Sequence, residues 1–131
     1  PERWLAYVSA AVGDPVLAMR IRDGLASLAW LRAQPGVDPE RVVVGGRGMG
    51  GIVALHVAAI DGRLRGVFAS GFPASFRTLA ESPRNQWPHD AFLPDVLAHY
   101  DIPELIANLK MPVFTAPEAD ALYDWVAERW R

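Results

Sequence analysis

The segment that most constrains the fold is a glycine-rich turn at Gly46–Gly51, whose sequence is Gly-Arg-Gly-Met-Gly-Gly. It follows a β-branched run without polar alternation at Arg41–Gly45, and it precedes a helical apolar pattern at Ile52–Ile60. Such a run is typical of a strand buried on both faces, as in a parallel sheet. A second apolar run at Leu64–Ala69 completes the order strand, helix, strand, which predicts a βαβ unit.

A longer helical pattern comes before this unit. Apolar residues recur every three or four positions over residues 15–33, with Asp14 placed to cap the helix and Pro15 at its first position. The helix after the glycine-rich turn is expected to end at Asp61, because Gly62 supplies a helix stop signal.

Residues 71–100 show little sustained period, which predicts a long loop with a short helix near 95–99. Loops of this length in compact domains are usually functional. Asp101 then opens a short helix that runs to Leu109, and Glu104 stands where a capping box requires an acidic partner.

A third apolar strand is expected at 111–115. Thr115 and Glu118 have the spacing of a capping box for a last helix, which carries Leu122, Val126 and Trp130. Strands alternate with helices along the chain, so residues 1–131 are predicted to form a single α/β domain with a three-layer, parallel-sheet arrangement.

Composition narrows the possible partners. The chain has 131 residues, 51% of them hydrophobic and 21% charged, with a formal net charge of −2. No basic stripe and no apolar run of membrane-spanning length is present, so neither nucleic acid nor a membrane is an expected partner. The absence of cysteine excludes disulfides and thiolate chemistry and is more usual in a reducing compartment, which makes the cytoplasm the default location.

The glycine-rich turn allows two chemical interpretations. It fits a nucleophile elbow, Gly-x-Ser-x-Gly, with glycine in place of serine. Gly46, Gly48 and Gly51 also fit the Gly-x-Gly-x-x-Gly loop that holds a dinucleotide pyrophosphate. A dinucleotide site requires an acidic residue about 20 positions further on. The next strand instead ends at Ser70-Gly71, which favours the elbow.

The run Asp23–Gly51 resembles the α/β-hydrolase superfamily, in which the corresponding turn has the sequence Gly-His-Ser-Met-Gly-Gly. The residues that carry the resemblance are Leu28-Ala29-Trp30-Leu31, Val37-Asp38-Pro39-Glu40-Arg41, the valine strand and Gly50-Gly51. Later fragments are similar to the acetyl xylan esterase and dienelactone-hydrolase-like group, namely Glu81-Ser82-Pro83, Trp87-Pro88, Phe92-Leu93-Pro94 and His99-Tyr100-Asp101-Ile102-Pro103-Glu104. The resemblance covers roughly residues 15–115 and implies a partial hydrolase domain.

That resemblance implies carboxylic ester hydrolysis through an acyl-enzyme, with serine, acid, histidine and an oxyanion hole. Carried over to this chain, the nucleophile position is Gly48 and one oxyanion N–H belongs to Met49. Glu118 or Asp120 occupies the place of the acid. No histidine follows His99, so we expect little or no serine-dependent turnover. A non-catalytic small-molecule-binding or interaction module is the alternative.

Each candidate residue also has a structural explanation. Gly48 is either a lost nucleophile or a glycine required by unfavourable backbone angles, and the two explanations are compatible. Capping alone accounts for Glu118 and is favoured over catalysis for Asp120 as well. Arg47 is expected to be a solvated side chain at the turn rather than an anion ligand.

The three histidines are not expected to act as bases or ligands. His56 is predicted to pack within an apolar helix, while His89 and His99 lie in the long loop without acidic partners at metal-ligand spacing. No metal and no cofactor are therefore expected. The loop aromatics either line a pocket or pack ordinarily, and they are Phe72, Phe76, Trp87 and Phe92.

The expected partners follow from the partial domain. A small ester or acyl molecule is the predicted ligand. The strand before Gly48 is central in complete hydrolases, so its free edge predicts self-association or pairing with the remaining part of a hydrolase domain.

Overall fold

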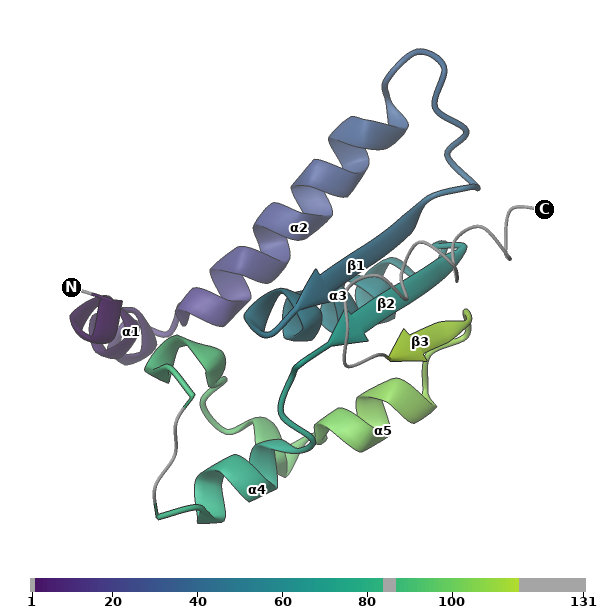
Figure 1. Ribbon diagram of the computed structural model, residues 1–131. Helices are drawn as coiled ribbons and strands as arrows, with labels where there is room; N and C mark the ends of the chain where they lie inside the picture. Colours follow the sequence, from purple (N-terminus) through teal and green to yellow (C-terminus); the bar gives the residue numbers. More distant parts are fainter. Residues whose placement is uncertain (1, 84–86, 116–131) are drawn as a thin grey trace.

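The computed structural model describes residues 2–83 and 87–115. Three parallel strands form a small open sheet in the order β1 (Val43–Arg47), β2 (Gly66–Ser70) and β3 (Val113–Thr115) (Figure 1). Phe68 of β2 pairs with Gly45 on one side and with Phe114 on the other. The predicted α/β class and the βαβ unit are therefore confirmed.

Helix α3 (Met49–Asp61) joins β1 to β2 and packs against both strands. Helix α2 (Val16–Arg32) packs in turn on α3. The two helices approach closely at Gly24, where a Cβ atom would lie 2.8 Å from a methyl group of Val57. Their shared core is made mainly of aliphatic side chains, among them Leu17, Ile21, Leu28, Ile52, Leu55, Val57 and Val67.

A partly buried ion pair joins the carboxyl ends of α2 and α3. The guanidinium of Arg32 donates to both oxygens of Asp61, at 2.6 and 2.9 Å, and also to the carbonyl of Pro39. The hydrogen bond from Arg32 holds the pKa of Asp61 below its usual range, although burial acts in the opposite direction. Asp61 ends α3 as predicted, and Gly62 follows in the left-handed region at φ 69°.

The two neighbouring strands differ in burial. Every residue of β2 is buried, whereas Gly45 and Arg47 of β1 are exposed and the rest of β1 is half-buried. The expectation that β1 is buried on both faces is wrong, because β1 is an edge strand of the described sheet. An open edge of this kind offers unpaired backbone groups to another strand, and self-association through it stays a prediction.

The layering is shown only in part. The extensive helix contacts with the described sheet are those of α3. A helix layer on the second face, which a three-layer arrangement requires, stays a prediction.

The N-terminal region contains a helix that the sequence pattern did not predict, α1 (Glu2–Ala11). The start of α2 also differs from expectation, because Pro15 occupies the N-cap position without a side-chain hydrogen bond. Asp14 does not cap α2; its carboxylate accepts a 2.7 Å hydrogen bond from Arg22 instead.

The segment expected to be a long loop contains three short helices. Helix α4 (Phe76–Glu81) was not predicted, because six residues are too few to show a helical period. The two 3-10 turns are η1 (His89–Ala91) and η2 (Val96–Ala98), and η2 lies where a short helix was expected. Residues 71–83 and 87–100 thus contain short helical turns.

Helix α5 (Ile102–Ala107) begins with the predicted capping box, since Asp101 accepts from the first turn and Glu104 accepts from the Asp101 amide. It ends two residues before the predicted Leu109. The last predicted helix, with Glu118 and Asp120, lies outside the described residues. Within 2–83 and 87–115, no helix combines the length and apolar character needed to cross a bilayer.

Candidate active site at the β1–α3 elbow

The backbone between β1 and α3 turns sharply at Gly48, which has φ 59° and ψ −122°. These angles match the first central residue of a type II′ turn, a position that glycine dominates. A residue with a Cβ atom held in such a region costs about 1–3 kcal/mol. The predicted backbone angles, unfavourable for any residue but glycine, are therefore present at Gly48, and we call residues 46–51 the elbow.

Close contact between strand and helix explains Gly46. A Cβ atom added there would overlap the carbonyl group of Gly50. At Gly51 an added Cβ would lie 3.3 Å from the carbonyl oxygens of Gly46 and Ser70, whereas at Gly50 it would meet nothing within 4 Å. Close approach of strand and helix therefore explains the glycines at positions 46 and 51, but not Gly50.

Space for a side chain exists at the nucleophile position itself. A Cβ atom added to Gly48 would have the carbonyl oxygen of Gly71 as its nearest neighbour, 4.0 Å away. The obstacle to serine at Gly48 is therefore the backbone conformation and not a steric clash.

Backbone hydrogen bonds fix the elbow against β2. The amide of Gly48 donates to the carbonyl of Ser70 at 2.8 Å, and the amide of Gly51 donates to the carbonyl of Gly48 at 3.0 Å. Met49 stands in the first turn of α3, where helix geometry supplies no intrahelical acceptor for the amide. Its N–H is therefore suited to a ligand oxygen, which fits the predicted oxyanion role without testing it.

A residue that the sequence analysis did not single out lies beside the elbow. Ser70 ends β2, is 2% exposed, and its Oγ has no hydrogen-bond partner among the described residues. Leaving a buried hydroxyl unpaired costs about 1–3 kcal/mol. The sequence offers only a weak signal for it, a serine at the carboxyl end of an otherwise apolar run.

His56 is remote from Gly48 and is buried, as predicted. It lies eight residues further along α3, about 12 Å at the rise of a helix. Its Nδ1–H donates to the carbonyl of Ile52 at 2.7 Å. In the neutral ring Nε2 is therefore an acceptor, and it accepts a 2.8 Å hydrogen bond from the hydroxyl of Tyr100. Burial lowers the pKa of His56, and the Ile52 hydrogen bond only partly opposes this.

The other polar candidates do not converge on the elbow. His89 makes a tilted ring contact with Tyr7, with ring centroids 5.1 Å apart, and exposed His99 lies 3.7 Å from Asp95. No cluster of three metal-ligating side chains occurs in the described part of the chain. Arg47 is exposed, as expected for a turn residue. Acid candidates Glu118 and Asp120 fall outside the described residues.

The loop aromatics divide between the two explanations left open by the sequence. Phe76 is 2% exposed and belongs to the core, and Phe72 and Trp87 pack partly buried against that core. Phe92 also packs partly buried against the core, and it lines a cavity near α1 as well. Packing therefore accounts for most of this group.

No protein-family model matches the chain, and neither a curated protein nor a solved structure matches it. Membership of the α/β-hydrolase superfamily therefore stays a prediction from the residues that resemble it.

Proposed function

We propose that this chain carries the nucleophile-elbow unit of an α/β-hydrolase-like protein and binds an ester or acyl group there without hydrolysing it. The observation that carries the proposal is the backbone of Gly48, held at φ 59° and ψ −122° between a parallel strand and a helix. An elbow nucleophile requires a strained turn of this kind. Glycine keeps the turn and lacks the attacking atom.

The N-terminus of α3 supports the proposal that an ester or acyl group binds at the elbow. This helix is 13 residues long, so its N-terminus carries a partial positive charge and outward amide groups. The N–H of Met49 would donate to the carbonyl oxygen of an ester, as one donor of an oxyanion hole. A negatively polarised oxygen is the group that such a helix end attracts.

The catalytic half is missing from the described part of the chain. Gly48 offers no oxygen to form an acyl-enzyme, and His56 is too far along α3 to take a proton from a group at Gly48. Glu118 or Asp120 remains the proposed position of the acid. Ground-state binding without turnover is what this set of residues supports.

The dinucleotide alternative is less well supported. The amide of Gly48 already donates to Ser70 at 2.8 Å and is not available to a pyrophosphate. The strand after the elbow ends at Ser70 and Gly71, with no carboxylate for a ribose hydroxyl.

The test combines an activity assay with a binding titration. We expect no hydrolysis of 4-nitrophenyl acetate above the buffer rate, and saturable amide shifts at Met49 when triacetin is added. Hydrolysis of 4-nitrophenyl acetate by the unmodified chain would contradict the proposal that the protein binds esters without hydrolysing them. Shifts at Met49 with NADH and none with triacetin would replace the ester ligand by a dinucleotide.

A further inference from the structure

We propose that a cavity between α1 and residues 89–94 binds a small, uncharged aromatic molecule. The cavity has a volume of about 330 Å³, which lies in the range of small-molecule sites. None of its lining residues belongs to the elbow, so this proposal is independent of ester binding at Gly48.

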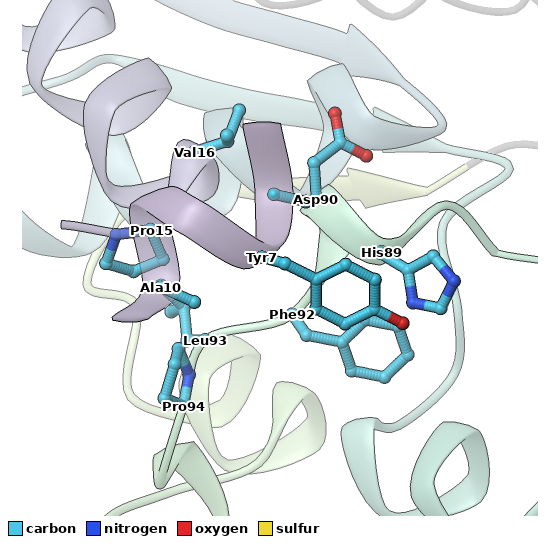
Figure 2. A pocket seen from close by; sticks show the side chains of 10 residues that line it. Tyr7, Ala10, Pro15, Val16, His89, Asp90, Phe92, Leu93 and Pro94 are labelled. Carbon is cyan, nitrogen blue, oxygen red and sulfur yellow. The ribbon is translucent and has the colours of Figure 1, made fainter. Parts of the chain in front are cut away.

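The cavity has an aromatic side and an aliphatic side. In Figure 2 the rings of Tyr7, His89 and Phe92 gather together, while Ala10 and Pro94 lie across from them. Aromatic rings favour offset or tilted contacts with centroids 4.5–7 Å apart. A flat ring bound here would stack on the aromatic side and place its other face against aliphatic carbon.

The charge of the cavity favours a neutral ligand. Asp90 lines it, but the carboxylate is nine-tenths buried and lies 2.7 Å from the guanidinium of Arg20. Figure 2 shows this carboxylate turned away from the rings of Tyr7 and His89. Because the pair neutralises itself, an ionic ligand would lose its hydration without gaining a counter-charge.

Two polar groups are available to orient the ligand. The hydroxyl of Tyr7 both donates and accepts hydrogen bonds, and the imidazole of His89 does the same in its neutral form. Both line the cavity. A ring that carries one hydroxyl or carbonyl group therefore matches it better than a pure hydrocarbon does.

Because α1 forms one side of the cavity, ligand binding there should stabilise this helix. Helix α1 contacts the rest of the described protein chiefly through α2 and η1, and its Trp4 is 73% exposed. A ligand that touches both α1 and residues 89–94 would hold the helix in place. Ligand binding should therefore slow amide exchange in α1.

The probe is 2-naphthol, which is neutral at pH 7, and its matched anion is 2-naphthoate. In a titration of the full chain followed by amide NMR, 2-naphthol should shift Tyr7, His89 and Phe92 with a dissociation constant on the order of 0.1–1 mM. We expect 2-naphthoate to bind at least about tenfold more weakly. Equal affinity for the two probes, or shifts confined to Met49, would overturn the proposal.

Variants locate the site. Ala10→Leu fills the cavity and should weaken 2-naphthol binding about tenfold or more, whereas Ala11→Leu changes the adjacent exposed position and should have no effect. Tyr7→Ala removes an aromatic wall of the cavity, and Tyr7→Phe restores the ring without the hydroxyl. Because Tyr7 is 55% exposed, both Tyr7 variants should fold even if Ala10→Leu does not. Unchanged binding by Tyr7→Ala would refute the site.

Discussion

The elbow and the segment after β2 are held in place by different means. Backbone groups of glycines define the elbow, through the angles of Gly48 and the contact of Gly46 with Gly50. In the later segment, one side chain does the comparable work. Asp101 accepts hydrogen bonds from the hydroxyl of Ser75 and the amide of Phe76, both at 2.6 Å, while also capping α5.

This difference shows where function can be lost without loss of fold. An elbow built from main-chain contacts keeps its shape when its reactive side chain is removed. A junction built on Asp101 has no such tolerance, because the carboxylate is itself the structural element.

The largest effect is expected at Gly46. Gly46→Ala places a Cβ atom on the carbonyl of Gly50, so β1 and α3 must separate. Such overpacking against rigid backbone should cost about 3 kcal/mol or more, measured by urea unfolding. The matched control is Gly50→Ala, which meets nothing within 4 Å and should be neutral or slightly stabilising. Equal losses in the two variants would show that glycine content, and not close approach, matters here.

The next largest effect is expected at Asp101. Asp101→Ala removes the acceptor of the Ser75 and Phe76 hydrogen bonds and the cap of α5. The loss should be about 2–3 kcal/mol, because hydrogen bonds to a charged group are involved. Amide exchange should increase in α4 and α5 together. An effect restricted to α5 would mean that Asp101 is only a local cap.

The carboxylate of Asp101 should also make the stability of the protein depend on pH. Burial raises the pKa of Asp101, but the hydrogen bonds from Ser75, Ile102 and Phe76 outweigh this and lower it. The unfolded state therefore binds a proton first, so this stabilisation is complete above about pH 5 and is lost as pH falls through the folded pKa. In Asp101→Asn the free energy of unfolding should depend less on pH in this acidic range, whereas in the exposed control Asp23→Asn the pH dependence should be unchanged.

The same contrast explains which elements the sequence predicts. The backbone conformation of residues 41–70 is determined mainly by residues close in sequence. The valine run indicates a strand, and Gly48 and Gly62 indicate the turns on either side of α3. The capping box of Asp101 and Glu104 is likewise local. These elements were predicted within a few residues, although the hydrolase relation itself rests on resemblance and stays a proposal.

Elements that depend on distant residues were not predicted. Nothing near Ser75, the N-cap of α4, indicates that Asp101 accepts hydrogen bonds at the start of α4 as well as capping α5. Asp14 looks like a cap, but Arg22 pairs with it. The edge position of β1 depends on which strands pair, and the unpartnered Ser70 hydroxyl depends on tertiary packing. Local patterns carry no information about such contacts.

Gly48→Ser tests whether the elbow is strained. Because space is available at Gly48, only the backbone should oppose the change, with a cost of about 1–3 kcal/mol in urea unfolding. The control is Gly62→Ser, which is also at positive φ with open space but lies in the milder left-handed region. We expect a smaller loss there. The Gly48 variant should still not hydrolyse 4-nitrophenyl acetate, because the described part of the chain places no base at the elbow. Efficient hydrolysis, or a gain in stability, would refute this account.

The smallest effect concerns Tyr100, which links the later segment to α3 through His56. Tyr100→Phe removes the donor to Nε2 and leaves a buried acceptor unpaired, at a cost of about 1 kcal/mol. Burial already lowers the pKa of His56, so the stability that the neutral ring supplies is complete above about pH 6.5 and is lost as pH falls through the folded pKa. In the variant, the neutral ring loses the hydrogen bond that it accepts at Nε2, so the pKa of His56 should rise toward its ordinary value. Histidine NMR titration measures this directly, with exposed His99→Gln as the control. A fall in the pKa of His56 would mean that the Tyr100 hydroxyl had instead stabilised the protonated ring, by accepting a hydrogen bond from Nε2.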